Sequence, residues 1–474
     1  MGGPTTELHH LTASSAIELF RSRELSPVEL LDAVVARTEK VEGRVNAVTG
    51  QLLDTAYESA REAERRYAGS GPAPRPLEGV PLALKEEHPI AGHTIEEGSL
   101  IAQGEIAEVS HPVVERVLAA GAVVHSRLTT PEFCCAPFTN SKLWGVTRNP
   151  WNLEQTPGGS SGGSGAALAA GETILATGSD IGGSIRIPAS FCGVVGFKAP
   201  FGRVPGLPPY NSDTYCADGP MGRSVADVAM LQNVLAGPHP HDQASLRPAY
   251  VLPTDPAPAA GLKVALCVTL GDFPVDPVVA ANTRAAAEAL RSMGVTVDEV
   301  TLPWSRERIA EISWAHFGEI MGAEIGALVE EYGDHLMPYT RRFAERALAG
   351  GGFAAGLVGE SELYRPLGEL LEDYDALLCP TVPAQGIAAD AIGDELLDID
   401  GTRTTFMDAM LTLPFNVIGR VPVLAVPSGL APNGVPTGVQ LVGRTYDDAT
   451  VFRLGAALES ALALWTQPDW WPAL

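Results

Sequence analysis

Two glycine-rich segments with central serines constrain this chain more than any other feature. The first reads Gly-Gly-Ser-Ser-Gly-Gly-Ser over residues 158–164, and the second reads Asp-Ile-Gly-Gly-Ser-Ile-Arg-Ile-Pro over residues 180–188. Glycine permits a positive φ and a close approach of the main chain to a ligand, so each loop can expose a serine hydroxyl beside backbone N–H groups. One alanine-rich segment of helical character separates them. The sequence therefore predicts two turns that can present a nucleophile and an oxyanion site.

A serine hydroxyl becomes a good nucleophile only when a base removes its proton. None of the ten histidines has an obvious partner in the sequence. Lys85 ends the apolar segment 79–85, which we expect to form a buried strand. Burial lowers the pKa of an amine, and a neutral lysine can act as a general base where an arginine cannot. The alternative is a structural lysine that reaches solvent or pairs with Glu86 or Glu87.

Three motifs follow one another along the chain: Gly-Val-Pro-x-x-x-Lys ends at Lys85, Gly-Gly-Ser-Ser-Gly-Gly contains Ser160, and Asp-x-Gly-Gly-Ser-x-Arg-x-Pro contains Ser184. In this order they resemble the amidase signature family, and similar flanking segments extend the resemblance over roughly residues 11–458. Ser184 follows Ser160 by 24 positions, the spacing expected for the two catalytic serines of that family. The resemblance implies an α/β fold, in which helices cover both faces of a large, mixed central β-sheet.

The resemblance also implies a role for each motif. Ser184 is the acylating nucleophile, Ser160 is a bridging serine in a cis peptide, and Lys85 is the base. A proton would pass from Ser184 through Ser160 to neutral Lys85 as Ser184 attacks an amide carbonyl. The relay would then return the proton to the leaving nitrogen, and water would release the acid. The oxyanion would be bound by four backbone N–H groups, those of Ile181, Gly182, Gly183 and Ser184.

One segment departs from the family pattern. The family usually has aspartate and asparagine after its lysine, whereas Glu86, Glu87 and His88 follow Lys85 here. An adjacent carboxylate favours the protonated amine, so the pH optimum can differ from that of the family. We expect the longer Glu86 side chain to reach the hydrogen bond made by the usual aspartate.

The first glycine-rich loop also fits another class of hydrolase. Both Gly158-x-Ser160-x-Gly162 and Gly159-x-Ser161-x-Gly163 match the nucleophile elbow of α/β-hydrolases, which requires a strand before the serine. The preceding residues 149–157 contain two prolines and several polar side chains, which indicate a loop. The interpretation as a nucleotide-binding loop has even less support, because no Gly-Lys-Ser/Thr follows the glycines.

The wide spacing of the motifs predicts one amidase signature domain over residues 1–474. We expect an N-terminal helical region over residues 1–70 and a Pro/Gly/Ala-rich surface connection over residues 237–261. Ser26 and Pro27 are typical of a helix start within the N-terminal region.

Several segments support the α/β class directly. A strand over residues 261–266, a helix over 277–293 and a strand over 295–297 would form a βαβ-like unit. Residues 113–120 read as a helix and residues 122–125 as a short buried strand.

Composition limits the partners and cofactors. The chain has 57 acidic and 32 basic residues and a net charge of −25, so we expect no nucleic-acid partner. No apolar run is long enough to span a bilayer and no signal-like core is present, which predicts a cytoplasmic protein that does not contact membranes. The six cysteines form no Cys-x-x-Cys pair, and no cluster with metal-ligand spacing is visible. We therefore expect reduced thiols, no metal and no cofactor.

The substrate is less constrained. Residues 129–138 resemble a segment that lines the acyl or amide site in relatives, and their apolar character favours an uncharged acyl group. Simple core packing explains the same pattern equally well. The candidate substrate-binding residues are Cys134, Cys135, Ala136 and Tyr210, followed by Asp213, Tyr215, His316, Phe317 and Met337.

These features predict an amidase that hydrolyses a carbon–nitrogen bond of a small-molecule amide. Relatives also serve as the glutaminase (A) subunit of a tRNA-dependent amidotransferase, which would add a protein partner and an ammonia channel. Acyl transfer to a nucleophile other than water and ester cleavage stay open, as does a homodimer.

Overall fold

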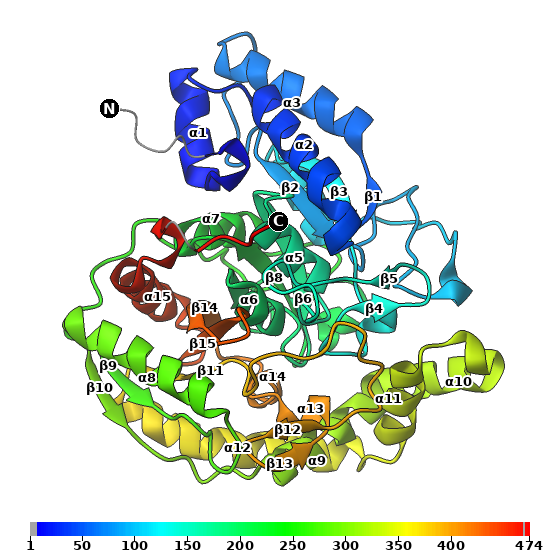
Figure 1. The fold of residues 1–474 in the computed structure, drawn as a ribbon, viewed down its shortest axis with the longest axis vertical. Helices are drawn as coiled ribbons and strands as arrows, with labels where there is room; N and C mark the ends of the chain where they lie inside the picture. Colours follow the sequence, from blue (N-terminus) through cyan, green and yellow to red (C-terminus); the bar gives the residue numbers. More distant parts are fainter. Residues whose placement is uncertain (1–6, 468–469) are drawn as a thin grey trace.

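The computed structural model describes residues 7–467 and 470–474. Within these residues, eleven strands form one sheet that crosses the molecule (Figure 1). In spatial order the strands are β1 (Val48–Gln51), β3 (Val123–Leu128), β2 (Pro81–Lys85), β6 (Leu175–Asp180), β8 (Ala217–Gly222), β7 (Val195–Lys198), β14 (Val423–Leu430), β15 (Pro436–Gly443), β11 (Ala376–Pro380), β9 (Lys263–Leu266) and β10 (Thr296–Glu299). Two small hairpins pair β4 (Asn140–Ser141) with β5 (Gly145–Val146) and β12 (Leu397–Ile399) with β13 (Thr402–Thr404).

The sheet is mixed, as the sequence predicts. Strands β2, β3 and β6 are parallel neighbours, and β9 is parallel to both β10 and β11. The strands between these two groups pair in antiparallel fashion. Strand β1 closes one edge by antiparallel pairing with β3.

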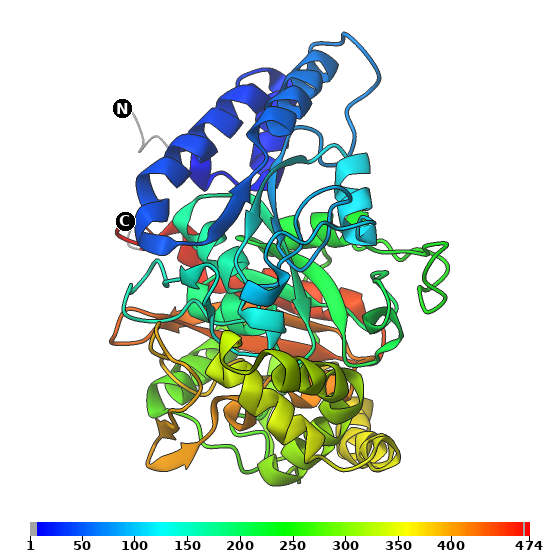
Figure 2. The ribbon, with the colours of Figure 1, turned by 90° about the vertical axis from the view of Figure 1, so that its right-hand side faces the viewer.

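Fifteen α-helices surround the sheet in the part of the chain that the structure describes. The first seven are α1 (Ala13–Ser22), α2 (Pro27–Val45), α3 (Leu53–Tyr67), α4 (Pro112–Ala119), α5 (Gly162–Ala170), α6 (Arg186–Cys192) and α7 (Val225–Leu235). The others are α8 (Pro277–Ser292), α9 (Arg306–Phe317), α10 (Ala323–Tyr332), α11 (Pro338–Leu348), α12 (Phe353–Asp373), α13 (Phe406–Ala409), α14 (Pro414–Val417) and α15 (Asp448–Leu462). Figure 2 shows α1–α3 at one end of the molecule and α9–α11 at the opposite end.

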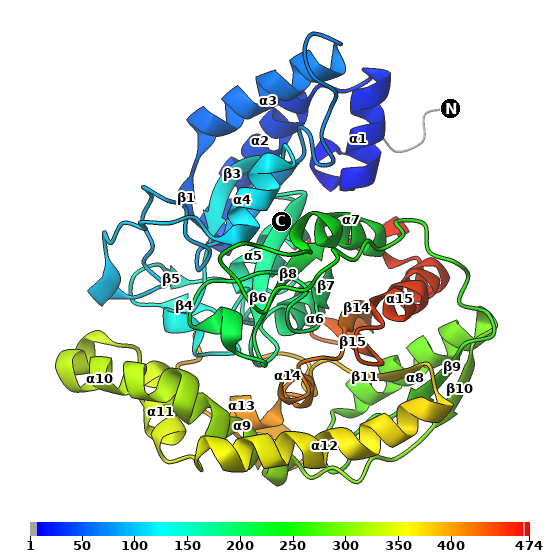
Figure 3. The same ribbon diagram turned by 180° about the vertical axis from the view of Figure 1, so that it is seen from behind.

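Helices cover both faces of the sheet, which confirms the predicted architecture. Successive side chains of a strand point to opposite faces, and in β2 Leu82 and Leu84 join one apolar cluster while Ala83 joins another. The Leu82 cluster contains residues of α1, α4, α7, α8 and α15. Helices α7, α15 and α8 follow one another along this face (Figure 3). The opposite face packs on α5 and α6, and farther along on α9, α12 and α14.

Local sequence signals give several of these elements correctly. Ser26 begins α2 with a capping box, in which its side chain accepts from Val28 N–H and Glu29 accepts from Ser26 N–H. The predicted βαβ-like unit is β9–α8–β10, with parallel strands. Residues 236–262 contain no helix or strand. No helix in the described ranges is both long and apolar enough to cross a membrane.

The parallel strands β3, β2 and β6 bring the motifs together. Parallel neighbours end at the same edge of a sheet, which is where ligands bind in open α/β folds. Lys85 is the last residue of β2, and Ser179 and Asp180 are the last residues of β6. The segment that contains Cys134 follows β3 at the same edge. Side chains from three separate regions of the sequence therefore meet at one edge of the sheet.

Candidate active site

Lys85 lies at the centre of the candidate site. Its side chain is fully buried, with an exposed fraction of 0%. The amine Nζ donates to Ser160 Oγ and to Ser179 Oγ, each at 2.7 Å, and forms an ion pair with Glu87 Oε2 at 2.7 Å. Ser179 Oγ donates to the same Glu87 oxygen at 2.6 Å. Lys85 thus contacts both the predicted bridging serine and a carboxylate.

Burial and the neighbouring acids oppose each other in setting the pKa of Lys85. Burial lowers the pKa, whereas the ionised forms of Cys134 and Glu87 raise it more, so the pKa lies above its usual value. Burial raises the pKa of the Cys134 thiol to about 12, so Glu87 is the relevant anion near neutral pH. The prediction of a lowered Lys85 pKa in the resting protein is therefore wrong, because the neighbouring acidic groups, Glu87 at 2.7 Å among them, together outweigh burial.

The two glutamates after Lys85 have separate environments. Glu86 accepts hydrogen bonds from the backbone N–H groups of Glu96 and Glu97, at 2.7 and 2.9 Å, and lies 3.6 Å from Arg127. Glu87, whose side chain is 23% exposed, is the residue that reaches Lys85. Both positions depart from the family pattern in the sequence, but we expected Glu86, and not Glu87, to make the hydrogen bond of the usual aspartate.

Ser160 is held in a closely packed loop. The Gly159–Ser160 peptide bond is cis, as the resemblance implies. A Cβ atom on Gly159 would lie only 2.6 Å from the carbonyl oxygen of Phe138 and 2.7 Å from that of Ala136. Only glycine permits this approach to the segment 136–138. The loop then continues into α5, and the buried Ser160 hydroxyl faces Lys85.

The loop that carries Ser184 folds around a buried ion pair. Arg186 contacts both carboxylate oxygens of Asp180 at 2.9 Å, and both side chains are fully buried. Asp180 also accepts from the N–H groups of Gly183 and Ile185, at 2.8 and 3.2 Å. Burial raises the pKa of Asp180, but Arg186 lowers it more, so the net pKa is below its usual value. The Asp-x-Gly-Gly-Ser-x-Arg pattern is thus a turn that is closed by its own first and last side chains.

The same contacts limit which groups can bind an oxyanion. Of the four predicted donors, the Gly183 N–H already donates to Asp180. The remaining three, those of Ile181, Gly182 and Ser184, donate no hydrogen bond within the described parts of the chain. Ser184 is 8% exposed, and it lines a cavity. These three N–H groups are the candidate oxyanion donors.

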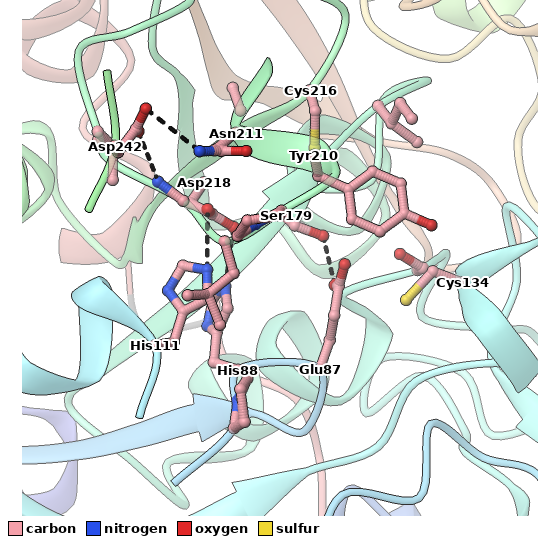
Figure 4. Close-up of a pocket in the computed structure, with 18 of the residues that line it drawn as sticks. Glu87, His88, His111, Cys134, Ser179, Tyr210, Asn211, Cys216, Asp218 and Asp242 are labelled. Atoms are coloured by element: carbon pink, nitrogen blue, oxygen red, sulfur yellow. Dashed lines mark hydrogen bonds and ion pairs between the residues drawn. The ribbon is translucent and has the colours of Figure 1, made fainter. Parts of the chain in front are cut away.

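Two cavities meet at this site. The larger has a volume of about 200 Å³, and Glu87 and Ser179 are among the residues that line it (Figure 4). Ser160 also lines this cavity. The smaller, of about 20 Å³, is lined by Ser184 and Gly182 together with apolar side chains. Both cavities share three lining residues, Cys134, Ile181 and Met321. The nucleophile loop therefore lies between a large and a small space.

The structure separates the predicted substrate-binding residues into four groups. Cys134 lines both cavities, Cys135, Ala136 and Phe317 line the smaller one, and Tyr210 lines the larger one. Asp213, Tyr215, His316 and Met337 line neither cavity, and the His316 ring stacks on Tyr215 at 3.5 Å. Sequence reasoning missed Ser179, Glu97 and Met321, which carry no motif of their own.

Sequence reasoning also missed a cluster of metal-ligand types beside the larger cavity. Asp218 lies 2.9 Å from His88 Nε2 and 3.4 Å from His111 Nε2 (Figure 4). His111 Nδ1 accepts from the Val113 N–H, and burial lowers the pKa of His111 to about 4, so the neutral ring carries its proton on Nε2. A metal would need the lone pair of that nitrogen. This arrangement is therefore suited to orienting Asp218 by hydrogen bonds.

A second cluster of metal-ligand types lies close to the N-terminus. It comprises Glu7, His9 and His10. Burial lowers the pKa of His9 to about 4 and that of His10 to about 3. Neither cluster was singled out by ligand spacing in the sequence, and the absence of a required metal stays a prediction.

The nucleophile-elbow alternative is not supported. Ser161 is fully buried, and its hydroxyl donates to the Ser179 carbonyl at 3.3 Å. No strand occurs in residues 147–160, which lie within the described part of the chain. Ser161 lines neither cavity. It therefore has the environment of a structural residue.

Comparisons with known proteins agree with this geometry. The family model described as Amidase matches residues 29–452. The A subunit of the glutamyl-tRNA(Gln) amidotransferase of Chloroflexus aggregans is 35% identical, over 96% of this chain and 97% of its own length.

Solved structures also superimpose on nearly the whole chain. A bacterial aryl acylamidase of the amidase signature family matches with a TM-score of 0.89 and 28% identity, over 97% of this chain and 98% of its own. The A subunit of the Thermotoga maritima glutamyl-tRNA(Gln) amidotransferase gives 0.77 and 26%, over 97% and 96%. With its motifs, fold and family match in agreement over most of its length, the chain belongs to the amidase signature family, whose members cleave amide carbon–nitrogen bonds.

Proposed function

We propose that this protein is an amidase that hydrolyses the carbon–nitrogen bond of a small-molecule amide through an acyl-enzyme on Ser184. The observation that carries this proposal is the 2.7 Å contact between the buried Lys85 amine and Ser160 Oγ, beside a cavity of about 200 Å³. This contact supplies the serine–lysine pair that a nucleophilic mechanism needs. Ser184 is in the neighbouring loop, where the Ser161 N–H donates to the Ser184 carbonyl at 3.1 Å.

The reaction starts in the fraction of molecules whose Lys85 has lost its proton. Neutral Lys85 takes the proton of Ser160, Ser160 takes that of Ser184, and Ser184 Oγ attacks the carbonyl carbon. The N–H groups of Ile181, Gly182 and Ser184 stabilise the oxyanion. Lys85 and Ser160 then return the proton to the leaving nitrogen, and water repeats the sequence to release the acid. Because Glu87 raises the Lys85 pKa, kcat/KM should increase with pH.

The test is a panel of primary amides, anilides and esters with the purified protein. We expect amide hydrolysis that is lost in Ser184→Ala and in Lys85→Ala. Hydrolysis of esters alone would assign the protein to ester cleavage. Addition of hydroxylamine during turnover separates hydrolysis from acyl transfer, because an acyl-enzyme that prefers a nucleophile other than water yields mainly the hydroxamate.

A second candidate function is the A subunit of a glutamine-dependent amidotransferase. The name of the Chloroflexus relative, at 35% identity, favours this candidate over the first. The charge of both cavities favours the first candidate, because neither has a lysine or arginine among its described lining residues. The α-carboxylate of free glutamine would have no cation to pair with in either cavity. Two measurements separate the candidates: release of ammonia from L-glutamine, and co-purification of stoichiometric partner subunits from the native host.

A further inference from the structure

The two cavities can be assigned to the two halves of an amide, if Ser160 and Ser184 act as in the proposed function, on which this inference rests. The leaving nitrogen must receive its proton from Ser160, and Ser160 lines only the larger cavity. The smaller cavity contains Ser184 and Gly182 but not Ser160. The amine half of the substrate therefore lies in the larger cavity, and the acyl half in the smaller one.

The smaller cavity fits a short apolar acyl group. Its volume of about 20 Å³ is close to that of a single methyl-sized group, and Phe317, Phe343 and Met407 contribute to its wall. No charged side chain is present in its described lining. An acetyl group meets these conditions, whereas a charged acyl group would lose its hydration without gaining a partner.

The larger cavity has more acidic than basic side chains in its wall. Its described lining contains four carboxylates and no lysine or arginine. Three of the four already have partners. Glu87 pairs with Lys85, Asp218 pairs with His88, and Asp242 accepts from the N–H groups of Gly206 and Ala244. The fourth carboxylate is that of Glu97.

Glu97 has a fixed backbone and an unpaired side chain. Its N–H donates to Glu86 at 2.9 Å, and its carbonyl accepts from the Phe133 N–H at 2.9 Å. Its carboxyl group makes no hydrogen bond or ion pair with any residue that the structure describes. Burial raises the pKa of Glu97 to about 8, and of the charged groups around it Glu87, Glu86 and Glu324 raise it further while Lys85 lowers it. A cation beside Glu97 would favour the ionised form of its carboxyl group and would give that group the partner that it lacks.

We propose that the larger cavity binds an amine half that carries a second, positively charged group, and that Glu97 is its counter-charge. Apolar side chains such as Ile95, Phe133, Tyr210 and Met321 form much of the remaining wall, and they suit an aromatic ring or an alkyl chain. The substrate class is therefore a short-chain N-acyl derivative of a diamine or of an aminoalkyl-aniline. Glu97 selects among substrates, while the serines and Lys85 carry out the reaction.

Three acetanilides test this proposal, because they differ only in the para substituent. These are 4-(aminomethyl)acetanilide, 4-(hydroxymethyl)acetanilide and 4-acetamidobenzoate, which are cationic, neutral and anionic near pH 8. The released anilines are quantified by liquid chromatography. We expect kcat/KM to be about tenfold higher for the cation than for the neutral compound, and lowest for the anion. In Glu97→Gln the ratio of cation to neutral should fall close to one.

Glu105→Gln is the matched control, because Glu105 is exposed, belongs to the same region and lines neither cavity. It should keep the wild-type ratio. Equal kcat/KM values for the cationic and neutral compounds, or a ratio that Glu97→Gln leaves unchanged, would overturn the proposal.

A binding measurement keeps the proposal testable even if none of the three compounds is hydrolysed. Titration calorimetry of each acetanilide with Ser184→Ala should show about tenfold tighter binding of the cation, and the double variant Ser184→Ala/Glu97→Gln should lose this difference. Absence of hydrolysis with this preference intact contradicts the proposed function alone. Equal binding of the cationic and neutral compounds contradicts the role of Glu97.

Discussion

Replacement of Glu87 by glutamine should shift the pH dependence of the enzyme in a direction that the Lys85 geometry determines. Glu87 raises the pKa of Lys85, so loss of its negative charge lowers that pKa. An amine with a lower pKa is neutral in a larger fraction of molecules at any pH below the wild-type pKa of Lys85. Since the relay needs neutral Lys85, the ascending limb of kcat/KM should move to lower pH.

The size of this displacement follows from the 2.7 Å separation of Lys85 Nζ and Glu87 Oε2. Coulomb's law at this distance gives about 1.5–6 kcal/mol for effective dielectric constants of about 80 to 20. The Glu87 side chain is 23% exposed, so solvent screening favours the lower part of this interval. We expect the limb to move by about 1–3 on the pH scale.

The assay is kcat/KM from pH 5 to 10 for one neutral amide, with wild type, Glu87→Gln and Glu105→Gln in parallel. Glu87→Gln should be the more active enzyme on the acidic side of the wild-type limb, and its advantage should be about tenfold if the limb moves by one on the pH scale. Glu105→Gln should superimpose on wild type. A limb that stays in place, or that moves to higher pH, would refute the reasoning that Glu87 controls the protonation of Lys85.

Three further variants or treatments test other contacts of the site. Lys85→Arg should be about as inactive as Lys85→Ala in steady-state assays, because arginine keeps the charge but does not release its proton. Ser160→Ala should retain more activity than either variant. A near-wild-type rate for Lys85→Arg would mean that Lys85 supplies only charge. Asp180→Ala should lower the free energy of unfolding in urea by about 3–5 kcal/mol, since it leaves Arg186 buried without its partner. The half-exposed pair of Asp375 and Arg444 is the control, and Asp375→Ala should cost about 0–1 kcal/mol, so equal losses would contradict the prediction. Dialysis against a strong chelator should leave amide hydrolysis unchanged, because the His111 Nε2 proton faces Asp218, and a loss of activity that zinc restores would show that the histidines beside Asp218 bind a catalytic metal.

Residues in local motifs were the ones that the sequence could place. Lys85, Ser160 and Ser184 are each part of a glycine- or proline-marked segment, and the mixed sheet with helices on both faces follows from the same resemblance. The cis peptide before Ser160 was expected for the same reason. Capping signals such as that of Ser26 fixed one helix start, because the interacting groups are only a few positions apart.

Contacts between distant segments account for what the sequence could not give. Ser179 and Glu87 meet only because β2 and β6 are parallel neighbours, and Asp218 meets His88 across 130 positions of sequence. The pKa of Lys85 depends on which of two adjacent glutamates turns toward it, and their order in the sequence does not determine this. Likewise, the Gly183 N–H is taken by Asp180, which becomes evident only when the turn is seen closed.

The identity of the acylated residue tests the proposed chemistry most directly. Purified protein is exposed to a fluorophosphonate or to a slowly hydrolysed ester, and its intact mass is measured before peptide mapping. We predict one adduct per chain, located on Ser184 and absent from Ser184→Ala, because the Ser184 loop combines a hydroxyl beside a cavity with three N–H groups that donate no hydrogen bond in the described structure. An adduct that persists in Ser184→Ala and maps to Ser161 would contradict the proposed mechanism.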